Sequence, residues 1–337
     1  MAIQFDPQGQ VFYLHTKHTT YAIGVLREKY LLHLYYGKHI SVYPDFMAHL
    51  PIHAGTTWMG TDLPGLDYST EALPMEYPTY GSADLRTPAF HAEYETGSAV
   101  TCLSYCGYVI YPGKKPLDSL PATYVENDSE ADTLEITLTD PLIGLKIILS
   151  YSVFEDYDII TKSVRAVNES VQPIDVQSIL SSTTYLFDKN YEFVHLTGAW
   201  ARERHIQKQP LMNGTMQIDS KRVASGHIHS PFLALARPWA TENQGEVYGY
   251  SFVYSGNFIM QAETNQQDVV RVNIGINPFG FHWLLEPGEV FQAPEVVMTF
   301  SNSGFGTMSR RFHRLYRQHL CRGKYRDIER PVLINNW

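Results

Sequence analysis

Apolar residues recur at every second position through most of this chain, in short segments separated by turn residues. From Leu134 to Leu138 they alternate with polar residues, which gives a β-strand one buried and one solvated face. A second alternating segment begins at Ile143, and Asp140-Pro141 supplies the turn before it, so the two segments predict a hairpin. Other segments rich in strand-forming residues predict strands over 11–14, 20–26, 31–36, 159–167, 176–183, 247–254, 258–262 and 269–276.

The number and spacing of these segments predict a mainly β fold. About fifteen short strands follow one another at roughly 8–12-residue intervals without alternating helices, which is typical of an antiparallel sandwich. We find no low-complexity tract and no internal repeat in the sequence.

One segment near the carboxyl end has the periodicity of a helix instead. Over 307–322, apolar residues share one face and arginines take the other. The apolar residues are Met308, Phe312, Leu315, Tyr316 and Leu320, and the arginines are Arg310, Arg311, Arg314 and Arg317. Ser303 or Thr307 is placed to cap the start of this helix, and Gly323 stands where a C-terminal glycine belongs.

The last eight residues, RPVLINNW, contain an apolar run that is typical of a buried strand in a parallel sheet. Such a strand needs neighbours on both edges, so we expect the chain to be the front part of a larger protein. We therefore place one domain at residues 1–325 and the start of a second at 326–337.

Charge and composition limit the kinds of partner that the chain is expected to bind and the compartment in which it is expected to occur. The chain has 26 Lys and Arg against 35 Asp and Glu, a net charge of −9, so neither nucleic acid nor an anionic membrane is expected as a partner. Three cysteines do not make a disulfide framework, and the start has no apolar signal-peptide core. No apolar run approaches the ~18 residues that cross a bilayer. We expect a cytoplasmic protein without a cofactor.

Two groups of polar residues are candidates for chemistry. His227 and His229 alternate on one predicted strand face as a metal pair would, but no third ligand is signalled by spacing, so no metal is predicted. Glu203 lies between Arg202 and Arg204, and neighbouring cations lower a carboxylate pKa. This favours a structural ion-pair lattice over a catalytic acid.

A long segment, 54–86, is rich in glycine, proline and acidic residues. An irregular loop of that length in a compact domain is usually functional or interfacial. Within it, Asp84 and Arg86 predict a turn with a salt bridge.

Several long stretches resemble the glycoside hydrolase family 36 α-galactosidases. They are GINPFGFHWLLEPGEVFQAPEVV, MSRRFHRLYRQHLCRG and RPVLINNW near the carboxyl end, with GAWARER (198–204) and HSPFLALARPWATENQGEVYGYSFVYSGNFIMQAE (229–263) upstream. The resemblance runs from about residue 5 to the end of the chain. It implies an antiparallel β-supersandwich of the galactose-mutarotase-like type, with a C-terminal helix leading into the first strand of a (β/α)₈ barrel.

The resemblance also implies a retaining α-galactosidase that hydrolyses terminal α-galactosyl residues of raffinose- or melibiose-type oligosaccharides. The two catalytic aspartates of that family fall on later barrel strands, so no catalytic residue is expected within this chain. The domain is expected to have structural, oligomerisation and active-site-loop roles. Trp337 matches the tryptophan that lines the galactose pocket at the end of the first barrel strand.

The resemblance further implies a homotetramer in which a loop of this domain, here 55–80, reaches the active site of a neighbouring subunit. This chain departs from the family at that loop, because Leu66 or Asp67 stands where some relatives carry a sugar-binding arginine. We assign Trp58 as an aromatic wall that compensates for this change. Substrate contacts are therefore expected from Trp337 and Trp58.

Two other classes of function stay open at this point. A stand-alone carbohydrate-binding module needs an exposed aromatic platform and no terminal helix and strand. A mutarotase-like epimerase needs a histidine base and a glutamate acid that converge in a groove of the sheet, with His227, His229 or His282 as the base. The motifs along the whole chain favour the α-galactosidase.

Overall fold

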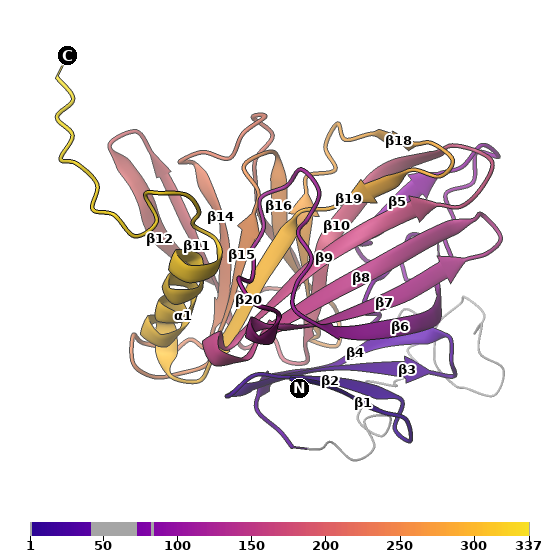
Figure 1. Ribbon diagram of the computed structural model, residues 1–337, viewed down its shortest axis with the longest axis horizontal. Coiled ribbons are helices and arrows are strands. Elements are labelled where there is room, and N and C mark those ends of the chain that lie inside the picture. The colour runs from indigo at the N-terminus through magenta and orange to yellow at the C-terminus, as the bar shows by residue number, and fades with distance from the viewer. Residues whose placement is uncertain (1, 42–72, 82–83, 337) are drawn as a thin grey trace.

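The structure is a computed structural model that describes residues 2–41, 73–81 and 84–336 (Figure 1). Three β-sheets make up most of it, and the named strands pair antiparallel throughout the described residues. The mainly β, antiparallel prediction is therefore confirmed.

The largest sheet has ten strands. In spatial order they are β12 (Arg202–Pro210), β11 (Glu192–Ala199), β14 (His229–Ala236), β15 (Val247–Val253), β20 (Glu295–Ser301), β9 (Ile159–Asn168), β8 (Leu145–Phe154), β7 (Asp132–Asp140) and β6 (Ser104–Pro112), with β19 (Val290–Gln292) also paired to β9. The predicted hairpin at Asp140-Pro141 is confirmed, because Asp140 pairs with Leu145 and Leu138 with Ile147.

Two smaller sheets complete the fold. The six-stranded sheet contains β13 (Gly214–Asp219), β16 (Phe258–Thr264), β17 (Val270–Ile276), β10 (Ile174–Leu186) and β18 (Trp283–Leu285), with β5 (Phe90–Glu93) also paired to β10. The N-terminal sheet contains β1 (Ile3–Asp6), β2 (Val11–His15), β3 (Thr19–Leu26) and β4 (Tyr30–Lys38), and it lies below the large sheet in Figure 1. Among the described residues, short 3₁₀ helices cover Asp128–Glu130 and Glu155–Tyr157.

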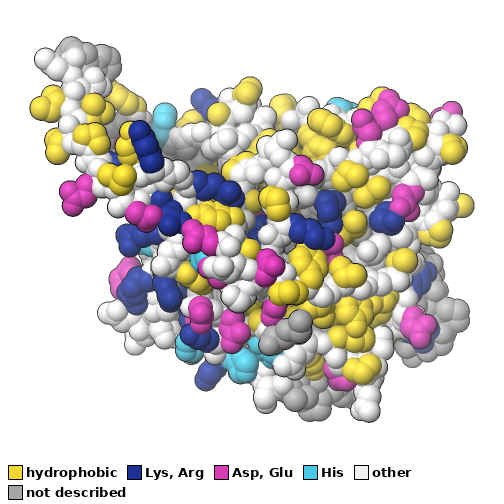
Figure 2. Space-filling model, in the orientation of Figure 1, with side chains coloured by type: hydrophobic (Ala, Val, Ile, Leu, Met, Phe, Trp, Pro, Cys, Tyr) yellow, Lys and Arg dark blue, Asp and Glu magenta, His cyan; other side chains and the backbone are white. Residues whose placement is uncertain are grey.

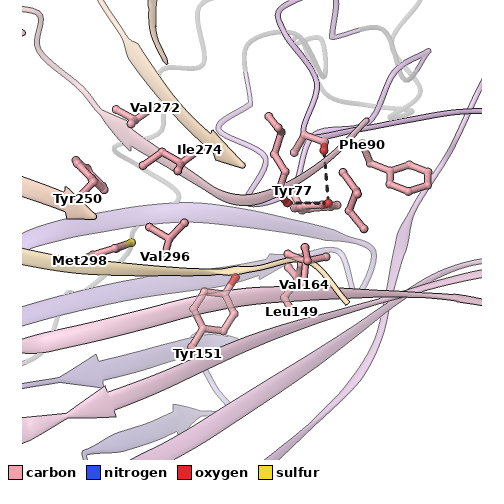
Figure 3. Packing of buried hydrophobic residues seen from close by; sticks show 14 of the residues in the cluster. Tyr77, Phe90, Leu149, Tyr151, Val164, Tyr250, Val272, Ile274, Val296 and Met298 are labelled. Carbon is pink, nitrogen blue, oxygen red and sulfur yellow. Dashed lines mark hydrogen bonds between the residues drawn. The ribbon is translucent and has the colours of Figure 1, made fainter. Parts of the chain in front are cut away.

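The main hydrophobic core joins residues of all three sheets. Figure 3 shows Val272 and Ile274 of β17 on one side of this core, with Val296 and Met298 of β20 on the other. All four side chains are completely buried. Burial of one such side chain contributes about 1.5–3 kcal/mol, so this core is what holds the sheets face to face.

One α-helix, α1 (Gly304–His319), occurs in the described part of the chain, and it begins three residues before the predicted start. The turn at 241–245 explains the difference, because its carbonyls accept the N–H groups of the first helical turn. Phe305 donates to the Thr241 carbonyl at 3.0 Å and Gly306 to the Glu242 carbonyl at 2.9 Å. Ser303 is the N-cap residue, but its side chain makes no capping hydrogen bond. That helix, as described, does not have the length and apolarity needed to span a membrane.

Two details of the predicted helix are wrong. The helix ends at His319 with Leu320 as its C-cap, because the Leu320 and Cys321 N–H groups both bond the Tyr316 carbonyl, so Gly323 lies beyond the end. Arg311 does not face solvent with the other arginines but is largely buried beside Asp158. The apolar run at 332–334 is exposed, and no described strand runs beside it to pair with its backbone, so its assignment as the first barrel strand stays a prediction.

A buried carboxylate links the three sheets. Glu76 accepts hydrogen bonds from Tyr21 of β3 at 2.7 Å, Tyr151 of β8 at 2.8 Å and Lys162 of β9 at 2.6 Å. Lys162 also donates to the carbonyl of Thr183 in β10 at 2.6 Å. We call Glu76, Lys162 and the two tyrosines the Glu76 cluster.

The electrostatics of the Glu76 cluster favour a charged pair. Burial by itself would raise the pKa of Glu76, but the positive charge of Lys162 and hydrogen bonds from His33 and Lys162 outweigh it and lower the pKa to about 2. The same burial lowers the pKa of His33, which lies 3.4 Å from the carboxylate. The carboxylate is therefore ionised across the neutral pH range.

Replacing Glu76 by glutamine, Glu76→Gln, should lower the free energy of unfolding at pH 7 by about 3–5 kcal/mol, because Lys162 is left buried without a counter-charge. Urea unfolding measures this loss. The double variant Glu76→Gln/Lys162→Met removes the unpaired charge and should recover much of it. Glu126→Gln is the matched control, because that side chain is 55% exposed and its ion pair contributes little.

The difference between wild type and Glu76→Gln should also depend on pH. The folded-state pKa is about 2 and the ordinary value is 4.5, so the contribution of the carboxylate is complete above pH 4.5. It should be lost as the pH falls toward 2. A Glu76→Gln protein as stable as wild type at pH 7 would show that the fold does not need the pair.

Candidate functional site

A groove of about 670 Å³ lies between α1 and the hairpin of β11 and β12, at one end of the large sheet (Figure 1). Strands β14 and β15 contribute to its floor. Its apolar lining consists of Leu196, Pro231, Phe232, Met308, Phe312 and Tyr316. Glu203, Arg204, His227 and His313 also line it. We call this feature the α1 groove.

The position of α1 follows from its apolar face and from one glycine. Met308, Phe312 and Leu315 are buried against the sheet. A Cβ atom on Gly249 of β15 would stand 2.7 Å from the Met308 Sδ and 2.8 Å from the Phe312 ring, so only glycine allows this close approach. On the same helix, Arg311 forms a 2.7 Å ion pair with Asp158. These contacts fix one wall of the groove.

The other wall is an exposed hairpin. All nine residues of β12 are exposed, and Trp200 at the hairpin turn is 81% exposed. A long uncovered edge strand is a site at which proteins pair with another chain or domain. The hairpin is therefore a candidate interface.

The ion-pair lattice predicted around Glu203 is wrong. In the described structure Glu203 accepts the backbone N–H of Ala201 at 3.1 Å and makes no salt bridge with Arg202 or Arg204. The register of β11 and β12 shifts between Thr197 and Ala199, and Arg204 has a φ of 60°. The prediction rested on the two arginines that flank Glu203 in sequence, and at this irregularity adjacent positions do not form ion pairs with it.

Five cavities in the described part of the chain lack the groups of a retaining glycosidase. That reaction needs two carboxylates about 5–5.5 Å apart. None of the five is lined by two carboxylates. The α1 groove has Glu203 alone, and its apolar floor suits docking better than hydrolysis.

The predicted substrate contacts cannot be placed here. Trp337, Trp58, Leu66 and Asp67 all lie outside the described residues. Most of the predicted loop 55–80 does so too, and only its end from residue 73 is described. These assignments stay predictions.

The candidate histidines are dispersed. His227 lines the α1 groove, while His282 lines a different cavity and lies 3.3 Å from Asp175. His229 packs against His195, with ring centroids 5.6 Å apart, and burial lowers the pKa of both. Among the described residues no three His, Cys, Asp or Glu side chains are arranged to hold a metal ion.

Two arginines hold the segment that starts at residue 84. Arg86 forms two 2.9 Å contacts with Asp84, which confirms the predicted salt bridge. Arg271 of β17, itself 1% exposed, also donates to Asp84, to the Tyr185 hydroxyl at 2.9 Å and to the Thr87 carbonyl at 3.0 Å. Burial by itself would raise the pKa of Asp84, but the charge of Arg271 and the bonds from Arg86 outweigh it and lower that pKa.

Sequence reasoning missed Glu76, Lys162 and Arg271. The signal for the two cations was a single charge inside an apolar strand, as in IITKSV and VVRVNI. A charge in a buried strand requires a partner. Nothing local in the sequence identifies that partner, since Glu76 and Asp84 are 86 and 187 residues away.

Comparison with family models matches residues 29–286 to the glycosyl hydrolase family 36 N-terminal domain and residues 290–337 to melibiase. The chain is 44% identical to α-galactosidase AgaA of Geobacillus stearothermophilus, over all of this chain and 46% of that protein. It is 37% identical to the bifunctional α-galactosidase/sucrose kinase AgaSK of Mediterraneibacter gnavus, over all of this chain and 36% of that protein. The chain thus spans less than half the length of these curated relatives.

Solved structures of α-galactosidases also match this chain. The GH36 α-galactosidase AgaB from Geobacillus stearothermophilus matches with a TM-score of 0.96 and 45% identity, over 100% of this chain and 46% of that chain. A variant of AgaA in complex with raffinose matches with a TM-score of 0.94 and 45% identity, over 97% and 45%.

Two aromatic truncations distinguish the two walls of the groove. Phe312→Ala should lower the free energy of unfolding by about 3–5 kcal/mol, because a buried ring between helix and sheet is lost. Trp200→Ala should change it by less than about 0.5 kcal/mol, because an exposed tip has no packing to lose within the chain. Denaturant unfolding of both variants measures these values. A large loss for Trp200→Ala would remove the hairpin tip as a candidate interface.

Proposed function

The chain belongs to glycosyl hydrolase family 36, and on that premise we propose that it forms the amino-terminal part of an α-galactosidase acting on raffinose- or melibiose-type oligosaccharides. The identity of 44% to AgaA along all 337 residues carries the proposal. AgaA variants are known in complex with raffinose and with stachyose, which supports α-galactosides as the substrate class.

In this proposal, hydrolysis is carried out by two aspartates in the part of the relatives that this chain does not span. Five cavities of the described residues are consistent with this assignment, since none of the five is lined by two carboxylates. Trp337 forms an apolar wall of the galactose pocket, and the 55–80 loop with Trp58 reaches a neighbouring active site. The enzyme is a cytoplasmic homotetramer.

The α1 groove and the exposed hairpin support a docking role for this domain. The groove has an apolar floor, and Trp200, at the turn of the hairpin that forms one wall, is 81% exposed. Val332, Leu333 and Ile334 are also exposed, which suits a segment that packs against another domain. We assign this end of the molecule to contact with the catalytic barrel.

The epimerase hypothesis has one observation in its favour, because His227 and Glu203 both line the α1 groove. Both side chains are exposed, however, and no hydrogen bond joins them in the described structure. A general base and a general acid that act on one substrate must be held in position by contacts of this kind. The chain should therefore show no catalysis of galactose mutarotation by polarimetry.

The 337-residue chain by itself should not release p-nitrophenol from p-nitrophenyl α-galactoside, because neither required carboxylate is in it. A family 36 α-galactosidase assayed in parallel is the positive control. The proposal fails if turnover co-purifies with the chain through several columns and disappears in Glu203→Gln, the variant of the carboxylate that lines the groove.

In the α-galactosidase that contains this chain, Trp337→Ala should remove roughly 2–3 kcal/mol of apolar contact with the sugar. The same wall contacts substrate and transition state, so KM should rise and kcat should fall. Trp239→Ala, at a side chain that is 58% exposed, is the matched control. Normal kinetics with a lowered melting temperature for Trp337→Ala would make this residue structural only.

A further inference from the structure

A second cavity, of about 300 Å³, lies at the six-stranded sheet and shares no lining residue with the α1 groove. Its floor includes Leu180 of β10 and Ile259 of β16. The other lining residues come from three places: β5, which pairs with β10, the segment before β5, and the turn between β17 and β18. We call it the Gln261 cavity, after the buried glutamine in its lining.

Strand register places two of the lining residues in one row. Ile259 pairs with Gly275, and Gly275 pairs with Leu180, so the three residues form one row across β16, β17 and β10. Side chains of laterally paired residues point to the same face of a sheet. The central residue of the row has no side chain, which lets Leu180 pack directly against its backbone. A Cβ atom on Gly275 would stand 2.6 Å from the Leu180 Cα, so the register excludes a larger residue there.

The wall nearest β5 is held by hydrogen bonds. The Thr87 N–H donates to Glu263 at 2.9 Å. The Thr87 carbonyl accepts from Arg271 and from Asn273, each at 3.0 Å. The cavity is therefore formed before any ligand enters.

The opposite wall is the turn from Pro278 to His282. The Phe281 N–H donates to the Pro278 carbonyl at 3.2 Å, and the Phe281 ring packs against Phe291 with centroids 5.8 Å apart. Phe281, Pro88 and Pro278 are apolar residues in the cavity lining.

The polar lining contains an unpaired group. Gln261 is 3% exposed, and its amide nitrogen has no hydrogen-bond partner among the described residues. A buried donor without an acceptor is destabilising. Half a turn about the last side-chain bond exchanges the amide oxygen and nitrogen, so either atom can face the cavity. A ligand hydroxyl there would serve as acceptor or as donor.

We propose that the Gln261 cavity binds one ring of a neutral sugar. None of the described residues that line it is Asp, Glu, Lys or Arg, which disfavours an ionic ligand. Gln177, Ser178 and His91 add further hydrogen-bonding groups, and Phe281 offers a flat apolar surface for the C–H face of a pyranose. A volume near the lower end of the usual ~300–1,000 Å³ suits a single ring. The cavity lies wholly within this chain, so the proposal does not require the catalytic role proposed above.

Saturation-transfer NMR on the 337-residue chain tests this proposal, with galactose and glucose as pyranoses and sorbitol as an acyclic polyol. We expect the pyranoses to bind with a dissociation constant on the order of 1–10 mM, as suits about a dozen non-hydrogen atoms. Sorbitol should bind more weakly, because it has no rigid C–H face to place on Phe281.

Gln261→Leu should weaken pyranose binding about tenfold, since it keeps the shape of the side chain and removes its amide. Phe281→Ala should weaken it by a similar factor. Gln217→Leu and Phe279→Ala are matched controls, because both side chains are exposed and neither lines the cavity. Without sugar, Gln261→Leu should melt at or above the wild-type temperature, which shows that the fold is intact.

Absence of saturation transfer to either pyranose would overturn the proposal, as would binding that both cavity variants leave unchanged. Equal binding of sorbitol would contradict the ring-stacking part. If Gln261→Leu does not fold, Phe281→Ala alone decides, because that side chain is only partly buried. Hydrolysis plays no part in this experiment, so its result is independent of the α-galactosidase proposal.

Discussion

The charged pair of Glu76 and Lys162 is the constraint on which the arrangement of the three sheets depends. A carboxylate without solvent exposure is tolerated only if it is paired and hydrogen-bonded, and here the partners come from β3, β8 and β9. Lys162 extends the link to β10. Hydrophobic burial favours many ways of stacking sheets, whereas this cluster is satisfied in only one of them. It also fixes the start of the segment from residue 73, which carries Glu76 itself.

The strands were predictable because their determinants are local. Alternation over Leu134–Leu138 and the Asp-Pro turn that follows predicted the hairpin of β7 and β8, which the structure confirms. The helix was displaced by three residues because its first N–H groups bond the turn at 241–245, about sixty residues away in sequence. The apolar run at 332–334 has the local pattern of a strand but is unpaired here. A strand requires a neighbour, and the described chain provides none.

The candidate sites depended on contacts that no local pattern records. Trp58 and Trp337 came from family resemblance alone, and both lie outside the described residues. The α1 groove lies between a hairpin near residue 200 and a helix that begins at Gly304. Neither segment has a local sequence pattern that indicates its contact with the other. The lining of the Gln261 cavity includes Leu180 and Ile259, and only the register of three strands places them in one row with Gly275.

Arg271 connects the charge network to the Gln261 cavity. Its guanidinium binds Asp84, the Tyr185 hydroxyl and the Thr87 carbonyl, and Thr87 is part of the cavity wall. The residues that anchor the chain at 84–87 to β17 therefore also set the position of that wall. A ligand in the cavity contacts this wall and the sheet beneath it at the same time. Ligand binding in the cavity and the hydrogen bonds of Arg271 are thus coupled, because both hold the segment before β5 against the same face of β10 and β16.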